Sequence, residues 1–153
     1  MALRQIVKEG DEVLRKVSRE VGQIDDRLQI LIDDMLQTMY ANNGAGLAAP
    51  QVGVLRRVFV MDVQDGTGAH VMINPRIISA SGSQIAHEGC LSIPGLWGDV
   101  ERPASLVMEA TDRQGRQITL NAAGMLAVCA SHEYDHLDGI LFRDKVKGEL
   151  TSE

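Results

Sequence analysis

Proline and glycine are spread so unevenly along the chain that they separate an irregular middle part from two ends in which helices can form. All four prolines and nine of the 15 glycines lie between Gly44 and Pro103. Proline cannot donate a backbone hydrogen bond inside a helix, and glycine favours turns. The middle part is therefore expected to contain short strands and loops, with helices nearer the ends of the chain.

Hydrophobic spacing predicts one helix on each side of this middle part. In the first, which Asp25 or Asp26 can cap, apolar residues recur every three or four positions until Asn42-Asn43-Gly44 ends the pattern. These apolar positions are Leu28, Leu31, Ile32, Met35, Leu36 and Met39. The second helix is a proline-free stretch from Ala122 to about Leu137, which Gly139 stops in the position of a C-terminal cap.

Strands are expected where runs of β-branched and apolar residues are bounded by turn residues. They are Val58 to Val63, Val71 to Ile73 closed by Asn74-Pro75, Gln84 to Glu88, and a hairpin of Leu106 to Thr111 with Gln117 to Leu120. The tail from Lys147 to Glu153 is expected to be solvated or frayed.

Length and charge limit the classes of protein that the chain can belong to. Its 153 residues suit a single domain, residues 1–153, large enough to bury a core without disulfides or a structural metal. A net charge of −6 argues against nucleic acid or an anionic membrane as the main partner, because both need a basic face. Two cysteines, no apolar run near the ~20 residues of a membrane span, and no signal or transit peptide in the first ten residues predict a cytoplasmic protein.

The segment His132-Glu-Tyr-Asp-His136 indicates a metal site. On a helix, residues four apart lie on one face about 6 Å from each other, so both imidazoles could bind one ion. Glu133 lies one residue further round, where it could reach a water on that ion without being a ligand. A helix with two ordinary histidines would give the same pattern, so a third ligand is needed to distinguish the two.

Three residues compete for the role of third ligand. Cys129 lies seven residues before His136, about 10 Å along the helix axis, too far for one ion to bind it and both histidines. It is better interpreted as a buried packing residue. In an extended segment His87 points to the opposite face from Cys90, whereas Glu88 shares a face with Cys90. Cys90 remains as the candidate, and a buried free cysteine is the alternative interpretation.

A glycine-rich segment from Gly44 to Ala49 matches the G-x-G-x-x-A fingerprint of dinucleotide-binding proteins, with Asp62 18 residues after Gly44. That fingerprint follows a strand and opens a helix. Here the segment follows a predicted helix, and Pro50 and Gly53 interrupt any helix after it. A loop that presents the amide of Gln51 to a substrate fits the residues better.

Three segments taken together resemble the signature motifs of the peptide deformylases, in the family's order and at its usual spacing. They are Gly44-Ala-Gly-Leu-Ala-Ala-Pro-Gln51, Glu88-Gly-Cys-Leu-Ser92 and His132-Glu-Tyr-Asp-His136-Leu-Asp-Gly139; the stretches Gly10 to Arg15 and Asp99 to Pro103 also look like that family. The resemblance implies an α+β fold in which antiparallel β-sheets pack around a central metal-binding helix, with an N-terminal helix. It implies an enzyme that removes the formyl group from N-formylmethionine at the start of new bacterial or organellar polypeptides and releases formate.

The same resemblance implies a role for each motif residue. One divalent metal ion would be held by Cys90, His132 and His136. The resemblance favours Fe²⁺ as this ion, with Zn²⁺, Ni²⁺ or Co²⁺ as possible substitutes. Glu133 would take a proton from water and pass it to the leaving amine, while the side-chain amide of Gln51 and the backbone N–H of Leu91 would hold the oxyanion. The substrate would contact Ala45, Gly46, Gly89, Met125, Val128 and Cys129, the last three around the methionine side chain.

The resemblance also names partners, and some residues depart from the family's pattern. Nascent formyl-methionyl polypeptides at the ribosome would be the substrate of a monomer that contacts neither nucleic acid nor a membrane directly. Ser131 stands where many members have Gln, His87 stands where a second Glu is common, and Ala45 and Ala86 replace larger apolar residues. The rival classes are a structural metal-binding module and a dinucleotide-binding protein.

Overall fold

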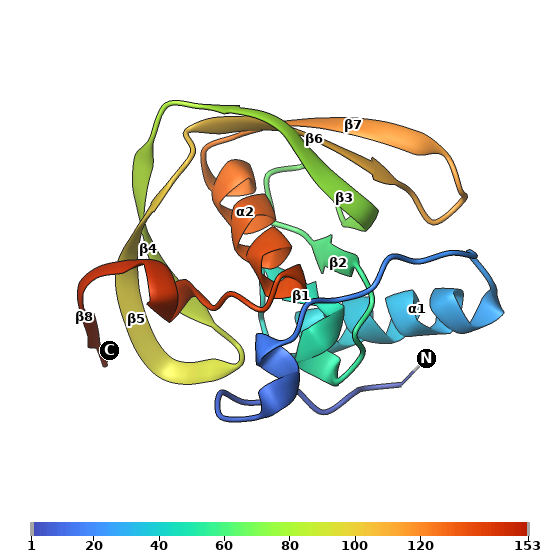
Figure 1. Ribbon diagram of the computed structural model, residues 1–153, viewed down its shortest axis with the longest axis horizontal. Helices are drawn as coiled ribbons and strands as arrows, with labels where there is room; N and C mark the ends of the chain where they lie inside the picture. The colour runs from blue at the N-terminus through green and yellow to red at the C-terminus, as the bar shows by residue number, and fades with distance from the viewer. Residues whose placement is uncertain (1, 153) are drawn as a thin grey trace.

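Two antiparallel sheets surround one helix in this protein (Figure 1). The computed structural model describes residues 2–152. Along the chain the elements are η1 (Glu12–Arg15), α1 (Asp26–Ala41), β1 (Gly46–Ala48), η2 (Ala49–Val52), β2 (Val58–Met61), β3 (His70–Ser81), β4 (Gln84–Cys90), β5 (Ile93–Arg102), β6 (Ser105–Thr111), β7 (Gln117–Ala123), α2 (Met125–Leu137), η3 (Phe142–Lys145) and β8 (Val146–Thr151). The expected α+β fold with antiparallel sheets around a central helix is confirmed.

Helix α1 begins and ends where the sequence predicts. The side chain of Asp25 accepts a hydrogen bond from the backbone N–H of Leu28 at 3.0 Å, which satisfies one of the free donors at the helix N-terminus. Five of the six predicted apolar positions are fully buried, and Leu36 is partly buried. This face packs against β1 and β2, so the helix closes the core on one side of the larger sheet.

The larger sheet has the strand order β1-β2-β3-β6-β7, and all of its neighbouring strands are antiparallel. Its edge strand β1 pairs Gly46 with Met61 and Ala48 with Phe59. This pairing fixes the glycine-rich segment beside α2, which it contacts directly. The smaller sheet has the order β4-β5-β8 and brings Cys90, at the end of β4, to the other side of α2.

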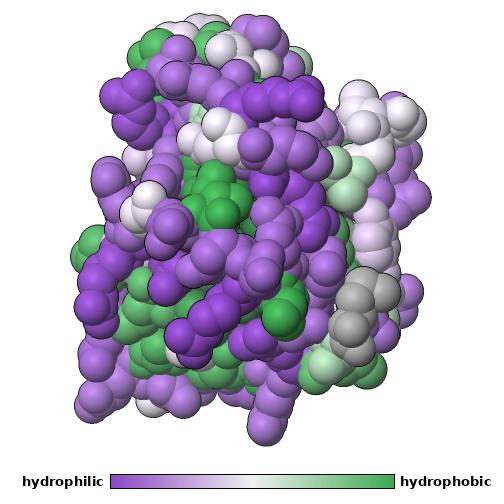
Figure 2. All heavy atoms as spheres, turned by 90° about the vertical axis from the view of Figure 1, so that its right-hand side faces the viewer, coloured by the Kyte–Doolittle hydropathy of each residue, from purple (hydrophilic) through white to green (hydrophobic). Residues whose placement is uncertain are grey.

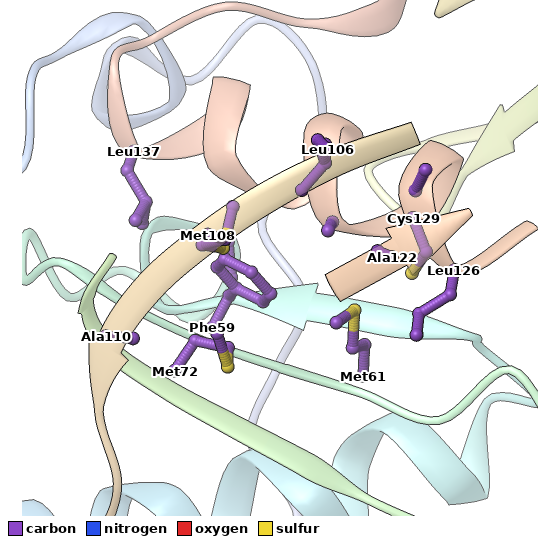
Figure 3. Packing of buried hydrophobic residues seen from close by; sticks show 13 residues of the cluster. Phe59, Met61, Met72, Leu106, Met108, Ala110, Ala122, Leu126, Cys129 and Leu137 are labelled. Atoms are coloured by element: carbon purple, nitrogen blue, oxygen red, sulfur yellow. The ribbon is translucent and has the colours of Figure 1, made fainter. Parts of the chain in front are cut away.

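Helix α2 is buried along most of its length, because both sheets pack on it. Its apolar residues Leu126, Ala127, Ala130 and Leu137 belong to the main core together with Phe59, Met61, Met72 and Met108. Figure 3 shows the side chains of Phe59, Met72 and Met108 gathered together, with Leu126 and Cys129 on the helix above Met61. A helix buried on nearly every side is held by packing rather than by its own propensity, so the residues that it carries are firmly placed.

The face drawn in Figure 2 is largely hydrophilic and is broken by small hydrophobic areas. Within residues 2–152, neither helix is both long enough and apolar enough to cross a membrane.

Several predicted element boundaries are wrong, those of β3 and α2 among them. Strand β3 does not close at Asn74-Pro75 but continues to Ser81. Pro75 is tolerated because the register shifts between Ile73 and Arg76, and the Asn74 side chain bonds both backbone groups of Val21 at 2.8 Å. Helix α2 begins at Met125 and not at Ala122, because Ala122 and Ala123 still pair with β6.

Strands β5 and β8 were not predicted from the sequence. The tail expected to be frayed forms β8, in which Lys147 pairs with Asp99 of β5, and only Glu153 lies outside the described residues. Strand β5 contains Pro94 and two glycines, which hid it. One of these, Gly98, is needed because a Cβ there would lie 2.8 Å from the Val146 side chain.

Candidate metal centre and substrate cavity

The three predicted metal ligands meet at one point. His132 and His136 come from α2, and Cys90 comes from the end of β4. One ligand atom of each lies within 4.8 Å of the others, and Cys90 Sγ is 3.4 Å from His136 Nε2. Ligands bonded tetrahedrally to one ion at about 2.1–2.3 Å are about 3.5 Å apart. The spacing of these atoms therefore fits a single metal ion.

A carboxylate that the sequence analysis did not assign fixes the orientation of His132. Glu88 Oε1 lies 2.8 Å from His132 Nδ1, so the other ring nitrogen faces Cys90 and His136. Glu88 is held in turn by two hydrogen bonds from Arg102, of 2.7 and 2.9 Å. Metal-binding histidines commonly donate their second N–H to such a carboxylate. The signal for it was the shared face of Glu88 and Cys90.

The protein shifts the pKa values of the two histidines in opposite directions. Burial lowers the pKa of His136 well below its ordinary value, so its imidazole is neutral and able to donate a lone pair. Burial by itself would lower the pKa of His132, but hydrogen bonds to Cys90 and Glu88 raise it well above the ordinary value. Two nitrogens with one sulfur form a donor set suited to Zn²⁺ or Fe²⁺.

Glu133 lies beside the predicted ligands. It is 3 % exposed, its Oε2 is 4.0 Å from His132 Nε2, and its Oε1 has no hydrogen-bond partner among the described residues. Burial raises its pKa to about 7, although the charge of His132 opposes the rise. A carboxyl group that gains and loses a proton near neutral pH is suited to general acid–base chemistry.

Gln51 lies next to Cys90, one of the three predicted ligands. Its Oε1 accepts the backbone N–H of Ala48 at 3.0 Å, which turns the amide nitrogen towards Cys90 Sγ, 3.5 Å away, and Ser92 Oγ, 3.1 Å away. Leu91 follows Cys90 in the turn between β4 and β5. The side-chain amide and the Leu91 backbone are thus adjacent to the same ligand atom.

A cavity of about 530 Å³ opens over this centre. All six residues predicted to contact substrate line it, and so do Gln51, Leu91, Glu133 and two of the ligands. The sequence analysis missed two further walls, one from Ile6 and Lys8 near the N-terminus and one from Trp97 in β5. No local pattern could indicate these walls, because they are created only when distant segments fold together.

Two of the glycines that line the cavity, Gly46 and Gly89, are required by packing inside the protein. A Cβ at Gly46 would lie 2.5 Å from Glu133 Oε2 and 2.9 Å from Cys129 Sγ. A Cβ at Gly89 would lie 2.8 Å from the Trp97 ring. Cys129 is 6 % exposed, and burial raises the pKa of its thiol, which suits the predicted packing residue.

The dinucleotide interpretation fails on its structural context. The segment from Gly44 to Ala49 follows a helix and leads into the four-residue turn η2, so it opens no helix long enough to bind a pyrophosphate. Asp62, the expected ribose ligand, accepts a hydrogen bond from Tyr40 at 2.7 Å.

Two of the residues that depart from the family's pattern form hydrogen bonds near the site. Ser131 accepts a hydrogen bond from Arg102 at 3.2 Å, and His87 bonds Asp99 at 2.8 Å beside Trp97.

Comparison with known proteins identifies the family. The model of the polypeptide deformylase family matches residues 3–151. The chain belongs to this family. It is 59 % identical over 146 residues to the peptide deformylase of Acetivibrio thermocellus, covering 95 % of this chain and 85 % of that protein. It is 50 % identical over 144 residues to peptide deformylase 1 of Clostridium perfringens, covering 94 % and 98 % of the two chains.

Solved deformylase structures agree with this relationship. The peptide deformylase of Thermotoga maritima superposes with a TM-score of 0.92 at 38 % identity, over 95 % of this chain and 99 % of that one. That of Synechococcus elongatus, in complex with actinonin, gives a TM-score of 0.90 at 46 % identity, over 94 % and 79 % of the chains. The sequence-based identification is confirmed: the chain is an enzyme of the class that removes the N-formyl group from nascent polypeptides.

Proposed function

We propose that this deformylase is a single catalytic domain, residues 1–153, whose reaction centre is one divalent metal ion held by Cys90, His132 and His136. The observation that carries the proposal is the convergence of these three ligand atoms within 4.8 Å, with Glu88 orienting His132. Fe²⁺ is the ion we propose, and Zn²⁺, Ni²⁺ and Co²⁺ suit the same donors. When bound, the ion supplies a Lewis acid and lowers the pKa of a water molecule.

The protein groups around the ion divide the remaining work. Glu133, which lines the cavity, takes the proton from water and passes it to the amine that leaves the formyl carbon. The Gln51 amide and the Leu91 backbone N–H stabilise the oxyanion, and one such donor contributes roughly 3 kcal/mol to transition-state stabilisation in comparable sites. Gln51 is pre-oriented by Ala48, so little reorganisation is needed.

The cavity supplies the binding groups for the formyl-methionyl end. Met125, Val128 and Cys129 form its helical wall, where an apolar and polarizable lining suits a thioether side chain. The peptide backbone would run past Ala45, Gly46 and Gly89 on the strand walls. We propose that the enzyme acts in this way as a monomer in the cytoplasm, on polypeptides that emerge from the ribosome.

Replacing Glu133 with Gln tests the proposed proton transfer. The variant keeps the size of the side chain and the three ligands but cannot hold the proton, so formate release from a formyl-methionyl peptide is expected to fall at least about 100-fold. Metal content should stay at one ion per chain. The matched control is Glu149→Gln, at an exposed position on β8, which should retain full activity. Turnover near that of the unmodified protein in Glu133→Gln would refute the assignment.

A further inference from the structure

Behind the metal ligands lies a connected set of charged side chains that reaches the surface. Arg102 is 2 % exposed and lies at its centre. One side of its guanidinium bonds Glu88, which orients His132, and its Nη1 bonds Asp135 Oδ2 at 2.7 Å. The same Asp135 oxygen lies 2.9 Å from Nζ of Lys145, a residue of η3. Lys145 is the only exposed member of the set, with 43 % of its side chain accessible.

The charges of this set balance only when Lys145 is included. Glu88 and Asp135 contribute two negative charges, and Arg102 contributes one positive charge. Both carboxylates and the guanidinium are buried, so the uncompensated negative charge would be costly. The ammonium of Lys145 neutralises it from the solvent side.

We propose that Lys145 is a positioning residue for the metal centre, acting through Asp135, Arg102 and Glu88 on His132. The inference rests on the proposed ligand set. Without Lys145, one guanidinium must compensate two carboxylates. Arg102 then shifts towards Asp135, its two-point hold on Glu88 loosens, and the His132 ring is less firmly aimed at the ion.

Metal release from Co²⁺-loaded protein, prepared without air, tests the proposal. Losing a direct partner of a metal-binding histidine typically weakens binding 10–100-fold. Lys145 acts through intermediates and is partly solvated, so Lys145→Met is expected to release Co²⁺ to a chelator about 3–10-fold faster. The visible absorption of the bound Co²⁺ should shift as well, because its ligand geometry changes. Lys145→Arg keeps the charge and should restore both properties.

Two further variants separate positioning from a merely structural tether. Lys147 lies two residues after Lys145 and forms an exposed ion pair with Glu101. Lys147→Met removes this ion pair and should change neither the rate of Co²⁺ release nor the spectrum. Asp135→Asn leaves Glu88 and Arg102 balanced by themselves, so adding Lys145→Met to it should accelerate release by less than about 2-fold.

Distinct outcomes overturn the inference or the function beneath it. Release from Lys145→Met at the unmodified rate with an unchanged spectrum would refute the role of Lys145, and so would equal acceleration in Lys145→Arg. A lower melting temperature alone, without faster release, would show only a structural tether and also refute it. If the unmodified protein failed to bind one Co²⁺ per chain, the proposed ligand set itself would be wrong.

Discussion

Among single residues, Gly46 is critical for the reaction centre because it has no side chain. Strand β1 passes so close to α2 that the position of Gly46 has no room for even a methyl group beside Glu133 and Cys129. The family resemblance implies that this glycine contacts the substrate. The structure adds a reason for a glycine at this position, which is the close approach of the protein's own strand and helix.

Replacing Gly46 with Ala should therefore impair catalysis by displacing Glu133. The added methyl would lie 2.5 Å from Oε2, which forces either the carboxylate or the strand to move. We expect kcat to fall at least about 10-fold while bound metal stays at one ion per chain, because a misplacement of about 1 Å can cost 100-fold in rate. Gly22→Ala, where the added methyl meets nothing within 4 Å, serves as the control. Unchanged formate release in Gly46→Ala would contradict this account of the contact.

Sequence patterns indicated the ligands but not the groups that hold them. The two histidines share one helix face, so their spacing alone brings them together. Arg102 reaches Glu88 from the neighbouring strand, and Asp135 reaches Arg102 from the helix. Such contacts depend on strand pairing and on helix placement, which no spacing along one segment reveals.

At the scale of elements, the prediction succeeded where one face is buried and the ends carry strong signals. Helix α1 has both an apolar stripe and the Asp25 cap, and its limits agree with the prediction. The β6–β7 hairpin was likewise recognised from its loop. Strand β8 was not predicted because its side chains are mostly exposed. Strand β5 was not predicted because Pro94 and its glycines normally indicate turns. In both strands, pairing with a partner outweighs weak local preference.

The N-terminal segment is attached to α1 through Asp34. This carboxylate accepts hydrogen bonds from the backbone N–H of Ala2 at 2.7 Å and from Arg4 Nε at 2.9 Å, while the Arg4 backbone bonds Thr38. Burial alone would raise the pKa of Asp34, but these bonds lower it below its ordinary value of 3.8. The segment leads directly into Ile6, which lines the cavity.

The stabilisation from Asp34 should depend on pH in a defined direction. Because its pKa is lowered in the folded protein, its contribution is present above pH 4 and is lost as the pH falls through the folded pKa. We expect Asp34→Asn to lower the free energy of unfolding by about 1 kcal/mol at pH 7, as typical for such hydrogen bonds. Urea unfolding at a series of pH values should show this difference shrinking below pH 4. A difference that stayed constant or grew on acidification would contradict the assignment.

Considering the whole molecule, the main core cluster contains none of the three proposed metal ligands. Phe59, Met72 and Met108 are fully buried between the larger sheet and α2, and Leu137 of the helix belongs to the same cluster (Figure 3). Ligand binding by the native state adds stability by mass action, but this core does not require it. The ion is therefore expected to serve catalysis rather than folding.

Chelation should separate these two roles. Removing the metal is expected to abolish formate release, to lower the melting temperature by several degrees through lost binding energy, and to leave the far-ultraviolet circular dichroism unchanged. Adding a divalent ion back without air should restore turnover. Unfolding on chelation would instead indicate a structural metal module, for which metal binding and folding are one event.

A titration with metal shows whether one ion bound by Cys90, His132 and His136 makes this chain an active deformylase. Metal-free protein receives Fe²⁺ in steps without oxygen, and formate release from a formyl-methionyl peptide is measured after each addition. We expect a linear rise that stops at one Fe²⁺ per chain, and no comparable rise in Cys90→Ala. A plateau at another ratio, or full turnover by Cys90→Ala, would contradict this expectation.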